Sequence, residues 1–479
     1  MLFHQRRFVA YPCGAPGLLT LNASSSLFSS SCRYTLVTTD RCVALLSYDA
    51  TGYSLQKLEV DALSTEEVNV IASAVVERPD TCPSQVAVAY AVGEALYVQV
   101  LIPYKESVDH AEPLGGGEFK LQTAPTCMYS IQASGTNGDV FYGVIVCCTD
   151  SMLAIGYIRN QMKAGSRVSV ESDAVCTLLD NDQFAEFFPE FATFTHTIMA
   201  VDILTSPETD QGWIVFGCAD GLVRVYHGQK LGRCLCGPFK VKDIQLNGPV
   251  TSVALFLKRS AMGETTSSTW HCNLLVTCAI GQALVYEDLF GAFDRIGNGE
   301  VLMDSDAFDS IFAGITADID LDGEVEFLLG TDSQVMLAYK EKGDDDNSSC
   351  KAMESSIELS VDETLPVNED APSLSPKSSQ NIWDDLEMIP VADTFVASSP
   401  EPVLVQRKWQ RLSRSHWDME TFGAIYSLLW RDVNHDGVPE LLVASSTGIY
   451  VYEADPEFVI KKLECVLSAL QGSPVNTNK

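Results

Sequence analysis

The stretch "TADIDLDGEVEFLLG", residues 316–330, places three aspartates at alternating positions and follows them with a glycine and a glutamate. Asp318, Asp320 and Asp322 offer carboxylate oxygens at the spacing with which calcium loops begin. An EF-hand loop also needs a bidentate glutamate at its twelfth position and a helix on each side. Counted from Asp318, the twelfth residue is Leu329, and the sequence that follows favours two strands joined by a turn. The stretch therefore predicts an acidic loop that leads into a β-hairpin, and it excludes an EF-hand.

A second copy of this pattern occurs in "RDVNHDGVPELLVASSTGIYVYE", residues 431–453. The residues at the same offsets are Asp432, Asn434, Asp436, Gly437 and Glu440. Here too the twelfth position is apolar and a hairpin follows. Two copies of one loop, each leading into a hairpin, indicate a repeat protein.

The hairpin after each acidic loop serves as a template for the rest of the chain. It consists of an apolar strand, a short turn with Gly, Asp or Ser, and a second strand that ends near a tyrosine. The template fits seven segments, which begin at residues 34, 85, 141, 213, 273, 326 and 440. The starts lie 51 to 72 residues apart, except for a last interval of 114. Such a period accommodates four strands, so the sequence predicts an all-β, seven-bladed β-propeller.

The long last interval contains an insertion, residues 341–400, with fourteen acidic and three basic residues. This segment is also rich in Ser and Pro, which is the composition of a disordered segment. Near the end of the chain, apolar residues at helical spacing and a final Gly predict a short C-terminal helix. The predicted organisation is blades 1–6 in residues 1–340, the acidic insertion in 341–400, the final blade in 401–455, the helix in 456–472 and a tail in 473–479.

Charge and cysteine content limit the functional classes. The formal net charge of −33 over 479 residues disfavours nucleic acid and anionic membrane surfaces as direct partners, because both call for a basic patch. The fifteen cysteines are scattered through apolar runs and form no C-x-x-C pair, which favours reduced, buried thiols. The first residues contain no apolar segment of signal-peptide length. We therefore expect a soluble, cytoplasmic chain that meets membranes only through partners.

Both acidic loops are candidate calcium sites, although the predicted fold requires no cofactor. The candidate ligands are the side chains of Asp318, Asp320, Asp322 and Glu326 with the carbonyl of Val325, and the side chains of Asp432, Asn434, Asp436 and Glu440 with the carbonyl of Val438. The alternative is that these side chains accept hydrogen bonds from nearby backbone N–H groups and shape the turns without a metal. The sequence leaves both interpretations open.

Candidate partner-binding residues lie in three places. The segment "FAEFFPEF", residues 184–191, contains Phe187, Phe188 and Phe191, which form either a partner groove or packing between blades. Trp383 and Leu386 lie three apart among carboxylates in the acidic insertion, and resemble a linear motif that docks as an added strand.

The third place is the basic cluster in "QRKWQRLSR", residues 406–414. Its candidate residues are Arg407, Lys408, Trp409 and Arg411. One interpretation is a surface for an acidic partner such as actin, and the other is an outer strand with solvated charges.

The paired acidic loops resemble the FG-GAP repeats of integrin-α propellers. More closely, "DAFDSIFAGITADIDLDGEVEFLLGTDSQVMLAYK", "FFPEFATFT", "FGCADGLVRV" and "NGPVTSVALF" resemble stretches of the kaptin family, from about residue 180 to 470. The resemblance implies a non-enzymatic propeller that is a subunit of the KICSTOR complex. In that complex it would help hold the Rag-directed GTPase-activating complex at lysosomes and so restrain TOR signalling when nutrients are low. It also implies the alternative of an actin-associated protein at motile cell edges.

Two other classes fit the sequence less well. An extracellular calcium-dependent adhesion propeller fits the loops, but not the N-terminus or the expected unpaired thiols. A propeller hydrolase would need an activity that Asp318→Ala removes, yet the sequence contains no H-E-x-x-H, G-x-S-x-G or phosphate-loop motif. We therefore expect a scaffold that acts by docking.

Overall fold

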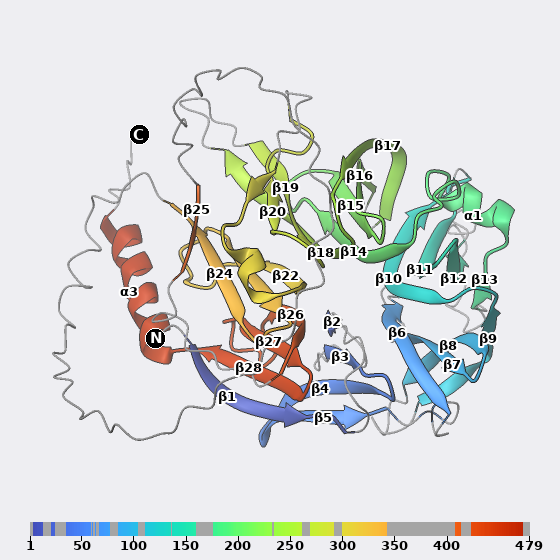
Figure 1. The fold of residues 1–479 in the computed structure, drawn as a ribbon, viewed down its shortest axis with the longest axis horizontal. Helices are drawn as coiled ribbons and strands as arrows, with labels where there is room; N and C mark the ends of the chain where they lie inside the picture. Colours follow the sequence, from blue (N-terminus) through green and yellow to red (C-terminus); the bar gives the residue numbers. More distant parts are fainter. Residues whose placement is uncertain are drawn as a thin grey trace, which may run out of the picture. The chain divides into compact units, whose positions relative to one another are not determined.

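Strands dominate the computed structural model (Figure 1). It describes residues 3–12, 21–23, 35–58, 60, 63, 67–76, 85–103, 111–135, 137–159, 176–231, 234–260, 269–291, 299–342, 408–412 and 423–472. The chain divides into two units, Met1–Glu341 with Trp409–Lys479, and Lys342–Lys408.

The described strands form five sheets of four strands and one of eight, whose two halves are joined by a single parallel pairing of Ala133 with Leu235. Apart from that pairing, they make seven antiparallel sets of four. The first three sets are β2 (Leu21–Ala23), β3 (Thr35–Thr38), β4 (Val43–Asp49), β5 (Gly52–Lys57); β6 (Val68–Val76), β7 (Gln85–Val92), β8 (Ala95–Pro103), β9 (Ala111–Leu121); and β10 (Pro125–Ser134), β11 (Val140–Cys148), β12 (Met152–Arg159), β13 (Thr177–Leu178). The next two are β14 (Ile198–Thr205), β15 (Gln211–Cys218), β16 (Leu222–Leu231), β17 (Cys234–Gln245); and β18 (Val250–Ser260), β19 (Thr269–Cys278), β20 (Leu284–Tyr286), β21 (Glu300–Val301). The last two are β22 (Ile311–Ala317), β23 (Glu326–Thr331), β24 (Met336–Glu341), β25 (Trp409–Arg411); and β26 (Ile425–Arg431), β27 (Glu440–Ser445), β28 (Gly448–Ala454), β1 (Phe3–Ala10).

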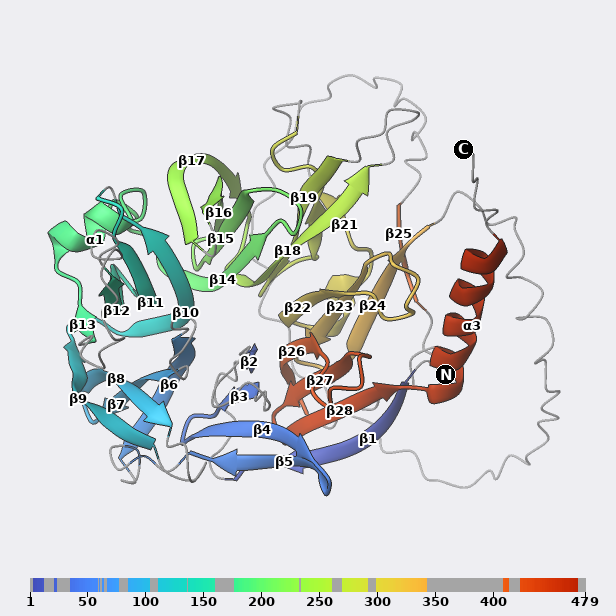
Figure 2. The same cartoon turned by 180° about the vertical axis from the view of Figure 1, so that it is seen from behind.

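The last set joins the two ends of the chain. Strand β1 pairs antiparallel with β28, from Phe3 opposite Ala454 to Ala10 opposite Gly448. Both views show β1 beside β28 (Figures 1 and 2). The N-terminal strand therefore belongs to the final blade. The predicted division differs, because it placed all of residues 1–340 in blades 1–6.

The sets are arranged as blades around a ring. The first strand of each set in chain order contacts the first strands of the neighbouring sets, in the order β2, β6, β10, β14, β18, β22 and β26. Contacts between β26 and β2 complete the ring. The fold is a seven-bladed β-propeller, as the hairpin repeat predicts.

The repeat has a structural counterpart in the blade cores. In four blades a buried tyrosine near the end of the third strand lies opposite an apolar residue at the start of the second strand. These pairs are Tyr226–Ile214, Tyr286–Leu274, Tyr339–Phe327 and Tyr452–Leu441. Because side chains alternate between the two faces of a strand, one such pair fixes which residues of the hairpin pack against the next blade.

The predicted C-terminal helix is present as α3, Pro456–Gly472. The other helical segments of the described residues are α1, Asn181–Phe187, and the 3₁₀ helix η3, Ser305–Phe308. Among the described residues, no helix is long and apolar enough to cross a membrane.

A hollow of about 450 Å³ opens among the first strands β10, β14, β18, β22 and β26. Its wall includes Asp202, whose Oδ1 accepts a hydrogen bond from the backbone N–H of Ile203 and whose Oδ2 accepts one from Leu255 N–H at 2.7 Å. Leu255 belongs to β18, so Asp202 links two neighbouring blades. Burial raises the pKa of Asp202 to about 6.

Candidate functional site

The first acidic loop connects β22 and β23, and backbone hydrogen bonds define its shape. Both oxygens of Asp318 accept hydrogen bonds at 3.0 Å, Oδ1 from the N–H of Asp322 and Oδ2 from that of Gly323. Gly323 has φ +89°, a conformation in which a side chain would be strained. These contacts are those of an acidic turn that folds around its own N–H groups.

Glu326 closes the first loop from inside the blade. Its side chain is completely buried, and its Oε2 accepts a hydrogen bond at 3.0 Å from the N–H of Ile319. Burial, with the neighbouring charge of Asp320, raises the pKa of Glu326 to about 7. A buried carboxylate of this kind needs a positive partner.

That partner is Lys340, from the third strand of the same blade. Its Nζ donates to Asp320 Oδ2 and to Asp322 Oδ2, each at 2.5 Å, and lies 3.0 Å from Glu326 Oε1. Burial alone would lower the pKa of Lys340, but the surrounding carboxylates outweigh it and raise the pKa above its ordinary value. One ammonium group therefore occupies the centre of the first loop. Sequence analysis missed Lys340 because its role depends on the strand register.

The second acidic loop, between β26 and β27, repeats the same turn. Asp432 Oδ2 accepts from Gly437 N–H at 3.2 Å, and Asp436 Oδ1 accepts from Val438 N–H at 2.8 Å. Glu440 is buried, and its Oε2 accepts from Val433 N–H at 2.6 Å. Burial raises the pKa of Glu440 to about 7.

The two loops differ in the residue that the third strand of their blade places beside them: a lysine beside the first loop and a glutamate beside the second. Lys340 directly follows Tyr339, and the residue that follows the equivalent Tyr452 is Glu453. Glu453 Oε1 accepts a hydrogen bond at 3.1 Å from the hydroxyl of Tyr53. In the described part of the chain, no Lys or Arg forms an ion pair with the carboxylates of the second loop. The second loop therefore keeps its negative charge.

This difference bears on the predicted calcium sites. In each loop, three carboxylates each place one oxygen within 4.8 Å of the other two. They are those of Asp318, Asp320 and Glu326 in the first loop and of Asp432, Asp436 and Glu440 in the second. In the first loop the ammonium of Lys340 already lies among them, so the residues do not fit an added dication. Buried oxygens without a hydrogen-bond partner occur in both loops, Asp320 Oδ1 and Glu326 Oε1 in the first and Asp432 Oδ1 in the second. A cation fits better in the second loop because no described ammonium pairs with its carboxylates. Calcium binding, with the carbonyls of Val325 and Val438 as ligands, stays a prediction.

The phenylalanine cluster lies in the core and not on the surface. Phe187, Phe188 and Phe191 are 7%, 4% and 2% exposed, and they pack between the β10–β13 and β14–β17 blades. Helix α1, which begins with a capping box between Asp180 and Gln183, holds the segment in place. Their burial against two blades favours the alternative of packing between blades. The three residues also line a hollow of about 450 Å³, and a partner groove there stays a prediction.

The basic cluster is also partly structural. Trp409 is buried, and its ring lies 4.2 Å from that of Phe327. The guanidinium of Arg411 lies 4.6 Å from the ring centre of Phe308. Both residues belong to β25, which completes the sixth blade by pairing with β24, although the predicted boundary placed them in the final blade. Trp409 thus packs inside its blade, and its role as a partner-binding residue stays a prediction.

Other predicted residues are placed only in part. Lys408 precedes β25, and its carbonyl accepts a hydrogen bond at 2.8 Å from the N–H of Lys342. Arg407, Trp383 and Leu386 lie outside the described residues, as does the predicted disordered insertion.

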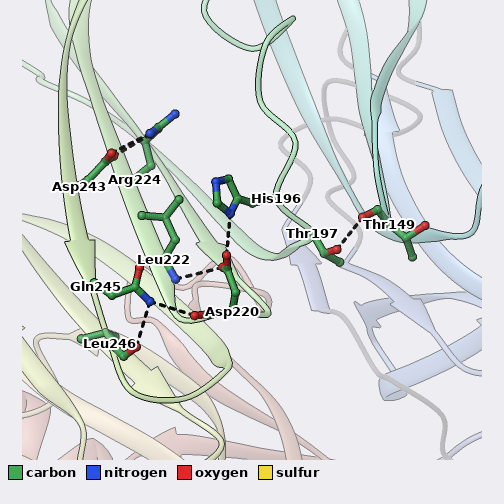
Figure 3. A network of polar contacts seen from close by, with 9 residues as sticks. All are labelled: Thr149, His196, Thr197, Asp220, Leu222, Arg224, Asp243, Gln245 and Leu246. Atoms are coloured by element: carbon green, nitrogen blue, oxygen red, sulfur yellow. Dashed lines mark hydrogen bonds and ion pairs between the residues drawn. The ribbon is translucent and has the colours of Figure 1, made fainter.

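A polar network that sequence analysis missed stabilises the β14–β17 blade (Figure 3). His196 Nδ1 and Asp220 Oδ2 are 2.6 Å apart, and Asp220 Oδ1 accepts from the N–H of Leu222. Gln245 Nε2 donates to the carbonyl oxygen of Asp220 at 2.9 Å. Thr197 Oγ1 donates at 2.6 Å to the carbonyl oxygen of Thr149 in the preceding blade. His196 lies far from Asp220 in the sequence, so no local motif reveals the contact.

The fold and its loops define a class of protein: a seven-bladed β-propeller whose acidic turns lie between the first and second strands of two adjacent blades. Residues 172–369 match the family model described as KICSTOR complex protein kaptin. Kaptin of Mus musculus is 33% identical over 159 residues, which are 33% of this chain and 35% of the mouse protein. The match thus spans about a third of that relative's length. Over this part of its length, the chain is similar to kaptin.

Two solved structures align with nearly the whole chain at low identity. The structure of BBS1N in complex with ARL6DN, soaked with mercury, has a TM-score of 0.41 at 10% identity and covers 95% of this chain and 96% of that one. The Myceliophteria thermophila Cps50 (Swd1) β-propeller domain has a TM-score of 0.41 at 11% identity and covers 94% and 99%.

Proposed function

We propose that this protein is a non-enzymatic scaffold subunit of a KICSTOR-like complex. In this role it helps recruit the Rag-directed GTPase-activating complex to lysosomes and restrains TOR signalling when nutrients are low. The observation that carries the proposal is the match of residues 172–369 to the family described as KICSTOR complex protein kaptin. Its partners are the other subunits of that complex, and it reaches the membrane only through them.

The acidic loops support a structural role more than a chemical one. Asp318, Asp432 and Asp436 accept hydrogen bonds from the backbone of their own turns, and Lys340 neutralises the first loop. Carboxylates held in this way shape the junction between two strands. On this proposal, the chain has no chemistry of its own and works through the surfaces that its blades present.

The test is the response of TOR signalling to loss of the protein. Cells without it are starved of amino acids, and phosphorylation of a TOR substrate is followed over time. The proposal predicts that phosphorylation persists in these cells and that re-expression restores its decline. A normal decline without the protein would contradict the proposed role.

The alternative proposal is association with actin filaments. It depends on the basic cluster, of which Trp409 is buried and Arg411 packs on Phe308. No contact in the described residues favours it over the scaffold role. Co-sedimentation of the purified protein with filaments tests it, and an absence of pelleting would reject it.

A further inference from the structure

Helix α3 exposes more apolar surface than any other described element. Ile460, Leu463, Val466 and Leu467 are 55%, 57%, 53% and 56% exposed. The other six large apolar residues that are exposed in the described part of the chain each lie alone on a strand or turn. Four such side chains on one helix form a contiguous surface that water does not favour.

The spacing of these residues is that of a helix–helix seam. Ile460, Leu463, Leu467 and Leu470 follow one another at intervals of three, four and three, as the a and d positions of a heptad do. Val466 lies next to this row and widens it on one side. A narrow apolar stripe with this period packs against another helix better than against a sheet.

The opposite side of α3 is partly covered. Phe458 and Lys462 are half-buried, and the Lys462 ammonium lies 5.6 Å from the ring centre of Phe458. Burial would raise the pKa of Asp322, but Lys340 and, more weakly, Lys462 lower it. Lys462 is therefore close enough to the first acidic loop to act on its charge. This leaves the stripe without a described contact, although a helix of this length draws most of its stability from packing.

The charges beside the stripe indicate what covers it. Glu457 and Glu464 lie seven apart, both at the e positions on the flank opposite Val466. In an antiparallel pair with a second copy of α3, these glutamates would face each other. In a parallel pair they would lie against Val459 and Val466. The net charge of −33 adds repulsion between whole chains, so a second copy is disfavoured.

We infer that the stripe of Ile460, Leu463, Val466 and Leu467 is a docking surface for an amphipathic helix of a different protein, with basic residues along its flanks. Such a helix covers the apolar row and places Lys or Arg opposite Glu457 and Glu464. The inference rests on the proposed function as a complex subunit, and it names the element through which one partner is held.

The experiment uses the purified full chain and two labelled heptad peptides, both with Leu and Ile at the a and d positions. One peptide has Lys at every e and g position, and the other has Glu there. We expect the Lys peptide to bind at least tenfold more tightly in fluorescence anisotropy. Leu463→Asp should weaken its binding at least tenfold, whereas Ser468→Asp, which adds the same charge away from the stripe, should leave binding unchanged.

A charge swap makes the test specific for the flank. The double variant Glu457→Lys and Glu464→Lys should reverse the preference in favour of the Glu peptide. Equal binding of both peptides, or equal effects of Leu463→Asp and Ser468→Asp, would overturn the inference. A concentration-dependent dimer in analytical ultracentrifugation that Leu463→Asp dissociates would also overturn it, because the stripe would then bind a second copy.

The failure of this inference is separable from the failure of the proposed function. If the wild-type chain retains its complex subunits in cells and Leu463→Asp retains them equally, the complex stands and the docking surface is rejected. If the wild-type chain retains no complex subunit, the proposed function itself is rejected.

Discussion

The ammonium nitrogen of Lys340 lies 3.0 Å from Oε1 of Glu326, a side chain that is completely buried. Lys340 belongs to the third strand of its blade, and Glu326 begins the second. The same nitrogen contacts Asp320 and Asp322, so one ammonium group is shared by three carboxylates of an acidic loop. The protein thus contains its own cation at a place where the sequence alone leaves calcium and a metal-free turn both open.

Removal of that ammonium should destabilise the blade. Lys340→Met leaves Glu326 and Asp320 without their positive partner, and breaking a buried ion pair costs about 3–5 kcal/mol. Because Lys340 is 28% exposed, we expect a smaller loss, about 2 kcal/mol in the free energy of unfolding. Urea denaturation measures it, with Lys461→Met on the exposed face of α3 as the control. Equal stability of the two variants would show that the ion pairs contribute nothing.

The same substitution should change the response to calcium. With Lys340 in place, the first loop has no room for a further positive charge, and only the second loop can respond. In Lys340→Met, calcium can enter the first loop, so millimolar calcium should raise the melting temperature more than in the wild type.

The reciprocal variant is Glu453→Lys, which gives the second loop an ammonium at the equivalent position. It should abolish any rise in melting temperature that calcium gives the wild type. A calcium response that neither variant alters would place the ion outside both loops.

Asp202 should make stability depend on pH. Its pKa of about 6 in the folded protein is higher than that of an aspartate in an unfolded chain, about 3.9. The folded state therefore binds the extra proton between these values, and Asp202 lowers the stability as the pH rises from about 4 to 7. Asp202→Asn has no such titration, so its stability relative to the wild type should improve over that range. Melting temperatures from pH 4 to 8 measure the difference, and parallel curves would refute it.

Substitution of Trp409 should lower the stability of the protein, because the ring packs inside its blade. Its ring is 5% exposed and packs on Phe327, and truncation of a buried Trp to Ala costs about 3–5 kcal/mol. Trp409→Ala should therefore lower the denaturation midpoint strongly, whereas Arg411→Ala should change it little. A Trp409→Ala chain with normal stability but lost binding would support the predicted partner role.

The sequence predicts the blades well because a half-buried hairpin repeats its apolar pattern locally. Tyr226, Tyr339 and Tyr452 mark the ends of these hairpins in the sequence and lie at equivalent positions in the structure. The pairing of β1 with β28 joins residues at opposite ends of the chain, and no local pattern contains it. Local patterns also fail to predict the position of β25, because it pairs with β24 across the insertion.

The site was harder to predict than the fold. The turn contacts of Asp318 and Asp432 follow from residue types at short spacing, so the sequence indicates them. Lys340 is an ordinary charged residue in "MLAYKEK", and its position over Glu326 depends on strand pairing. The burial of Phe187, Phe188 and Phe191 depends on two blades, so a local cluster of phenylalanines does not distinguish a groove from a core.

Affinity purification of the tagged protein from its own cells, with and without a chelator, tests the proposed membership of a KICSTOR-like complex. Subunits of such a complex and of the Rag-directed GTPase-activating complex should copurify with the protein, and the chelator should not release them. Recovery of actin alone, or of none of these subunits, would contradict it.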